Sequence, residues 1–163
     1  MALLLAARAR VLASAAASSS SRRALMLPPR DRRRRDFAAA AGAGGGPSAV
    51  QQMTVQELAE LLSLGDDGCE DIQFVDVREP DEFTTAKLPR FKLFPLSDAA
   101  NWAPRAETLL DPTARTIVLC HHGVRSMNAA TFLAQEKGFT DVYNVTGGID
   151  AYSLGADPSV PRY

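Results

Sequence analysis

The sequence has few cysteines and histidines and no long apolar run. Its 163 residues include two cysteines, two histidines and a single tryptophan. Two cysteines are too few for the disulfide framework that holds small secreted domains together. No stretch approaches the roughly 18 uninterrupted apolar residues that a membrane-spanning helix requires, so we expect no span. A chain of this length that is 46% hydrophobic can instead form one domain with its own core.

The first fifty residues contain no glutamate and no lysine. They hold nine of the eighteen basic residues, all arginines, but only two of the nineteen acidic ones, Asp31 and Asp36. Residues 51–163 therefore carry nine basic and seventeen acidic residues, a net charge of about -8. A domain with this charge is not expected to bind nucleic acid.

The basic N-terminal block is rich in alanine, arginine and serine and ends in the flexible stretch "AAAAGAGGGPS". This composition is typical of a cleavable organelle transit peptide. A secretory signal would need a longer apolar run than residues 3–7. We expect residues 1–47 to be transit peptide and disordered linker, and residues 48–163 to be the folded domain. The alternatives for "DRRRRD" at 31–36 are a solvated tail and a nucleic-acid patch. Residues 1–14 could form a mitochondrial type of basic amphipathic helix, whereas Ala2 and the serine cluster favour a plastid.

The rest of the chain alternates helical and extended patterns. Thr54 and Glu57 form a capping box before a helix that we expect to stop at Gly65. A second helix is predicted over residues 125–139, with Met127, Ala130, Thr131 and Ala134 on one face and Gly138 as its stop. Short β-rich runs, predicted to be strands, occupy residues 72–77, 116–120 and 141–145. Such alternation predicts a mostly parallel α/β sheet with helices on both faces and a ligand site beyond the carboxyl ends of the strands.

The stretch "LCHHGVRS" at 119–126 holds Cys120 and both histidines, at the end of a predicted strand. In a strand–loop–helix arrangement, several backbone N–H groups of this loop converge on the sulfur, and Gly123 allows the tight turn. The N–H groups and the positive helix end stabilise a thiolate by up to about 2 kcal/mol. Arg125 adds a positive charge that suits an anionic substrate or an ion pair. Ser126 could cap the helix or donate to the anion.

Other interpretations of Cys120 and the histidines predict different proteins. Cys120 could be a buried, unreactive residue at a strand end. A protease-like pair of cysteine and histidine is disfavoured because neighbours in sequence point in different directions. A zinc site is disfavoured because the chain offers three consecutive residues and the distant Cys69, and we predict no metal. Cys69 itself is interpreted as a surface or half-buried bystander, with a resolving partner for Cys120 as the alternative.

Three segments together carry a family resemblance: "FVDVREPDEF" at 74–83, "IVLCHHGVRS" at 117–126 and "GFTDVYNVTGGIDAY" at 138–152. In this order, with a cysteine ending a strand, they resemble a single-domain rhodanese, a sulfurtransferase. The resemblance covers roughly residues 50–163. It implies a five-stranded parallel sheet flanked by helices, no metal or organic cofactor, and a persulfide on Cys120. It also implies a substrate-binding loop formed by His121, His122, Gly123, Val124, Arg125 and Ser126.

In such an enzyme, Cys120 would take sulfane sulfur from a donor such as thiosulfate and pass it to a thiol, a protein or cyanide. The alternative is a non-catalytic module that docks on a partner or delivers sulfur to it. Phosphatase or arsenate reductase chemistry is disfavoured because four residues separate Cys120 from Arg125, one fewer than in the related phosphatases. The similarity of "CHHG", "GGIDAY" and "DPSVPRY" to cyanobacterial rhodaneses favours the chloroplast, stromal or thylakoid-associated, with the mitochondrion as the alternative.

The chain departs from the family pattern at two places. The usual Gly-His-Ile landmark is replaced by Ala86, Lys87 and Leu88, and a familiar tryptophan by Tyr152. We expect the fold to survive both changes.

Several residues near the resemblance motifs are assigned supporting roles. Asp76 and Arg78 are expected to lock loops near the site, and the Gly147–Gly148 pair to form a turn. The rings of His121 and His122 are expected at the pocket mouth, with a part-time positive charge, while their amides act on the sulfur.

Overall fold

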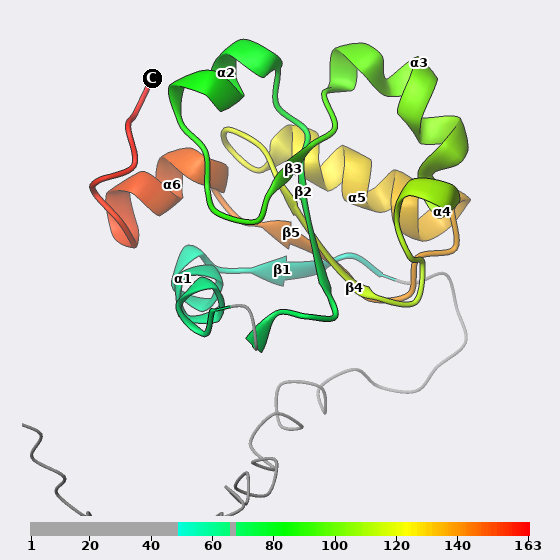
Figure 1. The fold of residues 1–163 in the computed structure, drawn as a ribbon, viewed down its shortest axis with the longest axis horizontal. Coiled ribbons are helices and arrows are strands. Elements are labelled where there is room, and N and C mark those ends of the chain that lie inside the picture. Colours follow the sequence, from blue (N-terminus) through cyan, green and yellow to red (C-terminus); the bar gives the residue numbers. More distant parts are fainter. Residues whose placement is uncertain (1–48, 66–67) are drawn as a thin grey trace, which may run out of the picture. The chain divides into compact units, whose positions relative to one another are not determined.

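A computed structural model describes residues 49–65 and 68–163. The predicted transit peptide and its boundary with the domain lie outside these residues. Within them, five parallel strands form one sheet in the order β1-β5-β4-β2-β3 (Figure 1). The strands are β1 (Gln51–Met53), β2 (Ile72–Asp76), β3 (Lys92–Leu93), β4 (Arg115–Leu119) and β5 (Val142–Val145). The α/β class and the five-stranded parallel sheet are therefore confirmed.

The larger helices are α1 (Val55–Ser63), α2 (Pro80–Thr85), α5 (Val124–Glu136) and α6 (Gly148–Gly155). The predicted capping box at the start of α1 is present, since Thr54 accepts from the Glu57 amide and Glu57 accepts from the Thr54 amide. Helix α5 ends shortly before Gly138, as expected. Its buried face is rotated slightly from the predicted one: Ala130 and Ala134 are buried, but Met127 and Thr131 are only partly covered.

The segment between β3 and β4 contains helices that the sequence pattern did not reveal. It forms short turns of helix at η3 (Leu96–Asp98), α3 (Ala99–Trp102), η4 (Ala103–Arg105) and α4 (Ala106–Leu109). None is long enough to repeat an apolar pattern. Trp102 anchors the segment, because its ring is buried and its Nε1 donates to the Pro95 carbonyl at 2.8 Å.

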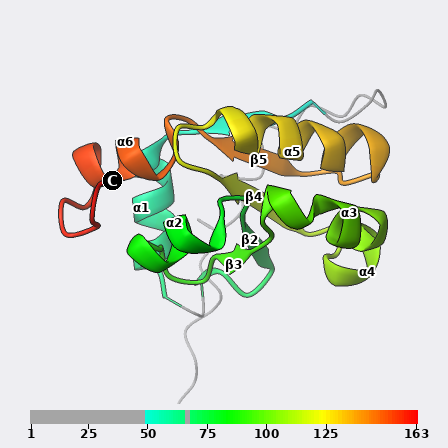
Figure 2. The same cartoon turned by 90° about the horizontal axis from the view of Figure 1, so that it is seen from above.

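Helices cover both faces of the sheet (Figure 2). Residues of α1 and α6 pack with Phe74, Ile117 and Leu119 on one face. Residues of α5 and α4 pack with Val75 and Val118 on the other. Consecutive strand residues point to opposite faces of the sheet, so each central strand contributes side chains to the core on each face. This is why the sequence of a central strand is a continuous apolar run.

Three residues that depart from the family pattern lie in the hydrophobic core. Ala86 and Leu88 are each 3% exposed and join the core beneath α1 and α6. Tyr152 is also buried there.

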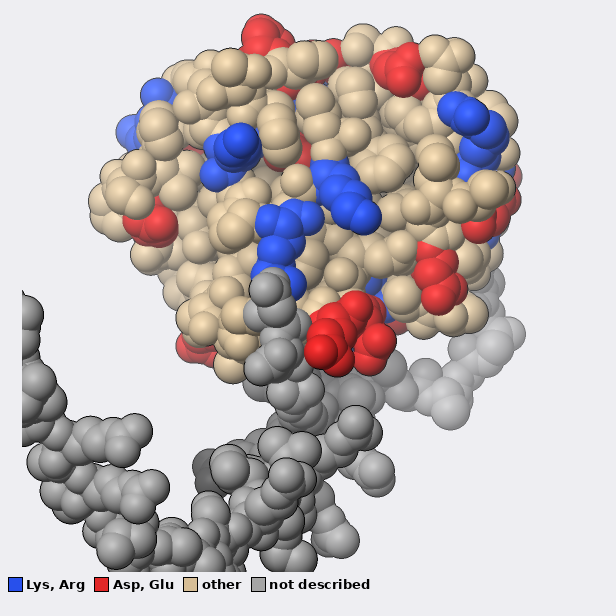
Figure 3. All heavy atoms as spheres, in the orientation of Figure 1, with Lys and Arg blue, Asp and Glu red and all other residues tan. Residues whose placement is uncertain are grey.

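No helix among the described residues is long and apolar enough to cross a membrane. On the face shown in Figure 3, lysine and arginine side chains stand among aspartate and glutamate side chains and form no continuous basic field.

Candidate active site

Cys120 directly follows β4, and α5 begins four residues later at Val124. The turn between them depends on Gly123, which caps α5 with a left-handed φ of 89°. A Cβ at this position would lie 2.9 Å from the Gly147 nitrogen, closer than real Cβ atoms approach. Both the conformation and the packing therefore require glycine here.

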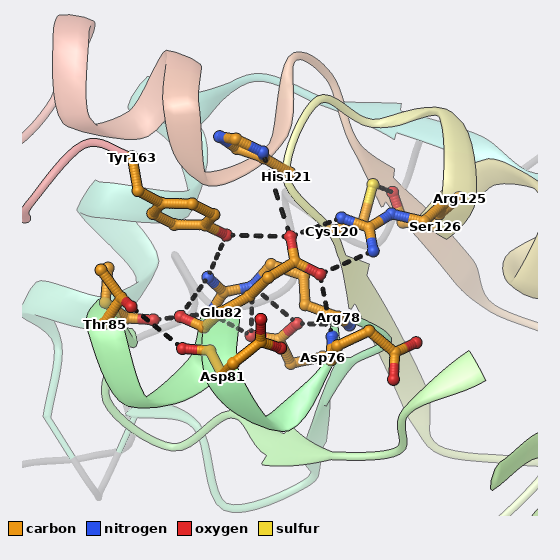
Figure 4. Close-up of polar contacts among 12 residues, drawn as sticks. Asp76, Arg78, Asp81, Glu82, Thr85, Cys120, His121, Arg125, Ser126 and Tyr163 are labelled. Atoms are coloured by element: carbon orange, nitrogen blue, oxygen red, sulfur yellow. Dashed lines mark hydrogen bonds and ion pairs between the residues drawn. The ribbon is translucent and has the colours of Figure 1, made fainter. Parts of the chain in front are cut away.

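Two donors, one in this turn and one in the first turn of α5, lie within hydrogen-bond distance of the Cys120 sulfur. The Gly123 amide lies 3.1 Å from Sγ. The Ser126 hydroxyl lies 3.2 Å from it (Figure 4). The sulfur also sits at the N-terminus of the 13-residue helix α5, where the helix dipole is positive. Cys120 is only 1% exposed, so a thiolate at this position would depend on these two donors and the helix dipole in place of water.

Ser126 does not cap α5 but connects the sulfur to β5. Its hydroxyl oxygen lies 2.6 Å from Oδ1 of Asn144, and Nδ2 of Asn144 donates to Oε1 of Gln52 at 3.1 Å. A hydroxyl has one hydrogen, so Ser126 donates either to Asn144 or to the sulfur at any moment. The thiolate and Asn144 compete for that hydrogen.

Arg125 is held by Glu82, a residue of α2. Nη1 and Nη2 of the arginine lie 2.7 and 2.6 Å from the two carboxylate oxygens, a bidentate pair (Figure 4). The hydrogen bonds from Arg125 lower the pKa of the Glu82 carboxyl to about 2. Hydrogen bonding to Glu82 likewise raises the pKa of the Arg125 guanidinium above its ordinary value.

Tyr163 covers the loop from the far end of the chain. Its ring stacks on His121 with centroids 4.2 Å apart, and its hydroxyl accepts from Arg78 at 2.7 Å. The same hydroxyl donates to Glu82 at 3.2 Å. Burial and the neighbouring His122 lower the pKa of the His121 ring. The positive charge that we expected from this ring is therefore reduced near neutral pH.

Helix α6 fixes the loop from the side. The Ile149 amide donates to the Cys120 carbonyl at 2.9 Å, and the Asp150 amide donates to the His121 carbonyl at 3.1 Å. Gly148, which begins the helix, allows this close approach. The expected turn at Gly147 and Gly148 is present, with both residues in left-handed conformation.

A groove of about 340 Å³ borders the loop. Its lining consists of Gln52, His122, Gly123, Val124, Met127, Asn128, Asn144, Thr146 and Gly147. None of these residues carries a full charge. His122 thus faces a cavity at the loop, as expected of a ring at the pocket mouth, whereas His121 lies beneath Tyr163.

Three side chains near the loop could offer ligands to a metal ion. Single ligand atoms of His121, His122 and Asp150 all lie within 4.8 Å of one another. The Asp150 carboxylate already accepts from Arg162 at 2.9 Å, and the two histidine rings lie against each other with centroids 4.0 Å apart. Three possible ligand atoms are thus close together, and the Asp150 carboxylate is shared with Arg162.

A family model for the rhodanese-like domain matches residues 54–154. The chain belongs to the rhodanese-like family. It is 52% identical over 94 residues to rhodanese-like/PpiC domain-containing protein 12, chloroplastic, of Arabidopsis thaliana, a match that covers 58% of this chain and 31% of that protein. The chain thus spans about a third of that relative.

Shorter relatives match the rhodanese-like domain over nearly their whole length. The thiosulfate sulfurtransferase GlpE of Pseudoalteromonas translucida is 30% identical over 114 residues, covering 70% of this chain and 99% of the relative. A rhodanese-like domain protein from Staphylococcus aureus, known from its crystal structure, is 26% identical in sequence and superposes with a TM-score of 0.53. The match covers 70% of this chain and 99% of that protein chain.

In this rhodanese-like domain, Asp76 and Arg78 lock loops together, as the sequence suggested. Both are fully buried, and their ion pair measures 2.7 Å. Arg78 also donates to the Ala86 carbonyl at 2.8 Å and to Tyr163. It thereby joins the end of β2, the end of α2 and the C-terminal segment beneath the loop.

Cys69 differs from its predicted position. It is 3% exposed, donates to the Leu61 carbonyl at 3.4 Å and belongs to the core beneath α1, whereas Cys120 belongs to the core beneath α5. Both thiols are free. Cys69 is thus a buried core residue, not a surface thiol, and the sheet separates it from Cys120.

Sequence reasoning gave no role to three residues that surround the loop: Glu82, Asn144 and Tyr163. Glu82 stands inside the "DEF" part of a segment that carried the resemblance, and Tyr163 in the "DPSVPRY" stretch. Asn144 was a usable signal, because it is a polar residue between Tyr143 and Val145 in a predicted strand. Such a residue is buried only when its amide finds hydrogen-bond partners.

Proposed function

We propose that this rhodanese-like protein is a sulfurtransferase that carries sulfane sulfur on Cys120. The donor would be a compound such as thiosulfate, and the acceptor a thiol or cyanide. The observation that carries the proposal is the position of the Cys120 sulfur, which lies 3.1 Å from the Gly123 amide at the N-terminus of α5. Relatives named thiosulfate sulfurtransferase support the same reaction class.

The proposed reaction has two displacements at sulfur. The Cys120 thiolate attacks the outer sulfur of thiosulfate, a sulfur–sulfur bond forms, and the bond to the sulfonate group breaks to release sulfite. An acceptor thiolate or cyanide then attacks the outer sulfur of the Cys120 persulfide and leaves with it. This step regenerates the thiolate. The amides of residues 121–125 would cradle the outer sulfur, and Gly123 and Ser126 would stabilise the thiolate.

The short loop also bears on which group is transferred. Only four residues separate Cys120 from Arg125, which gives a small cradle, suited to one sulfur atom and not to a phosphoryl group. An aryl phosphate is therefore a useful negative substrate. Hydrolysis of this compound that depends on Cys120 would count against sulfur transfer.

A non-catalytic binding module is the second candidate, and the 1% exposure of Cys120 favours it. Intact mass separates the two. The purified domain is incubated with thiosulfate and, separately, with cysteine hydropersulfide. Sulfur transfer predicts a gain of one sulfur atom that is lost in Cys120→Ser and kept in the matched control Cys69→Ser. No gain with either donor would leave the binding module as the better explanation.

We also propose that the protein acts in the chloroplast, in the stroma or at the thylakoid. The arginine-rich first fifty residues and the chloroplastic relative support this location. Residues 1–50 fused to a fluorescent protein should direct it to chloroplasts in leaf cells. Import into mitochondria instead would overturn the assignment.

A further inference from the structure

The positive charge of Arg125, the arginine of the loop, is already neutralised inside the protein. Both of its terminal nitrogens bind the Glu82 carboxylate, at 2.7 and 2.6 Å. The arginine side chain is 36% exposed, so a ligand at the loop can reach it, but the carboxylate occupies the bidentate face of the guanidinium. An anionic donor would have to compete with Glu82 for that face.

Two further arginines near the loop are also paired with carboxylates. Arg78 is buried against Asp76 at 2.7 Å, and Arg162 binds Asp150 at 2.9 Å. The His121 ring is partly buried beneath Tyr163, which disfavours its charged form. A dianion such as thiosulfate, approaching a thiolate, therefore meets no uncompensated charge from these four side chains.

The groove beside the loop is suited to an uncharged organic group. It is lined by amide, hydroxyl and apolar side chains, with Val124 68% exposed at its edge. Its volume of about 340 Å³ lies at the lower end of the range for small-molecule sites. Asn144 on its wall also contacts Ser126, which touches the Cys120 sulfur. Gly123, whose amide contacts the sulfur, also lines the groove. The groove therefore borders the loop that holds the reacting atom and offers a place for the organic part of a sulfur carrier.

We propose that the preferred sulfur donor is a small organic hydropersulfide, RSSH, and that Glu82 selects it over thiosulfate by neutralising Arg125. This inference rests on the proposed sulfurtransferase function. The Cys120 thiolate attacks the outer sulfur of RSSH, the bond to the inner sulfur breaks, and the thiol RSH leaves with the proton. The Cys120 persulfide anion remains. The reactive donor is neutral at its sulfurs, so it needs no free cation, and its organic group R occupies the groove.

The test compares kcat/KM for cysteine hydropersulfide and for thiosulfate, at constant ionic strength and with one acceptor thiol. The wild-type protein should favour the hydropersulfide by about tenfold or more. Glu82→Gln keeps the shape of the side chain and an oxygen that accepts from Arg125, but removes the negative charge. It should raise kcat/KM for thiosulfate by about tenfold and change the hydropersulfide value less than about threefold. Glu107→Gln, which removes a carboxylate from the exposed pair with Lys137, is the matched control.

A second variant keeps the test decisive if Glu82→Gln loosens the loop. Asn128 is exposed on α5 at the groove, and Asn128→Lys places a new cation there without touching Glu82. It should raise kcat/KM for thiosulfate severalfold. A wild-type preference for thiosulfate, or a ratio that neither variant moves, would overturn the inference. Failure of Cys120 to gain sulfur from either donor would instead overturn the proposed function itself.

Discussion

Gly148 and Cys120 are in backbone contact across the candidate site. A Cβ on Gly148 would lie 2.4 Å from the Cys120 carbonyl oxygen and 2.3 Å from that of His121. The next residue, Ile149, donates its amide to the same Cys120 carbonyl. The start of α6 is thus fixed against the backbone of the sulfur-bearing loop, and this contact has no room for a side chain.

Gly148→Ala should therefore destabilise the domain by about 2 to 4 kcal/mol, because the backbone of α6 or of the loop must move. Gly138→Ala is the matched control: Gly138 also has a positive φ, 70°, but a Cβ there would meet nothing within 4 Å. The control should lose only about 1 kcal/mol. Urea unfolding measures both values, and equal losses would show that the contact with Cys120 carries no special cost.

Ser126→Ala removes one of the two donors within reach of the Cys120 sulfur. Loss of a hydrogen bond worth about 1 kcal/mol should slow alkylation of Cys120 by iodoacetamide at neutral pH by about three- to tenfold. Ser153→Ala is the control, because this serine is also buried in a helix but donates to the Ile149 carbonyl. An unchanged rate in Ser126→Ala would mean that the hydroxyl serves Asn144 alone.

The folded domain should lose stability at acid pH as Glu82 becomes protonated. The pKa of this carboxyl is lowered to about 2 by hydrogen bonding to Arg125, from an ordinary value of 4.5. A carboxyl with a lowered pKa in the folded state stabilises that state above its ordinary pKa, and the contribution is lost as pH falls from about 4.5 towards 2. With solvent screening, we expect a loss on the order of 1 kcal/mol.

Chemical unfolding of the wild-type protein and Glu82→Gln between pH 6 and about pH 2.5 measures this contribution. The stability of the wild-type protein should exceed that of the variant at the upper end, and the difference should shrink as the pH falls. A difference that stays constant over this range would contradict a role for the ionised Glu82 in stability.

His121→Ala and His122→Ala should each lower sulfur-transfer turnover only about two- to fivefold, because the rings act at the rim of the site and not as the proton-transfer group. His122 lines the groove and is exposed, whereas His121 supports Tyr163. Steady-state turnover with either donor checks the prediction. Abolition of turnover by either change, with the fold intact, would assign a ring to the chemistry.

The central strands and long helices could be predicted because each carries its own signal. β2 and β4 are apolar runs, and α1 begins with a capping box. β1 and β3 were missed because they have three and two residues and lie at the edges of the sheet. Such short strands are defined by pairing with a neighbour, which a local pattern does not contain. Cys69 was misplaced for the same reason, since its polar sequence neighbours hide its contact with the core beneath α1.

The sequence by itself determined the position of Cys120 at the end of a strand and the short loop to Arg125, because strand, turn and helix signals act over a few neighbouring residues. Only the tertiary structure decided what surrounds that loop. Glu82 reaches Arg125 across 43 residues, and Tyr163 reaches Arg78 across 85. These contacts depend on how α2 and the C-terminal segment pack over the carboxyl ends of the strands. Whether Arg125 attracts an anion or is neutralised by a carboxylate is therefore a property of the fold.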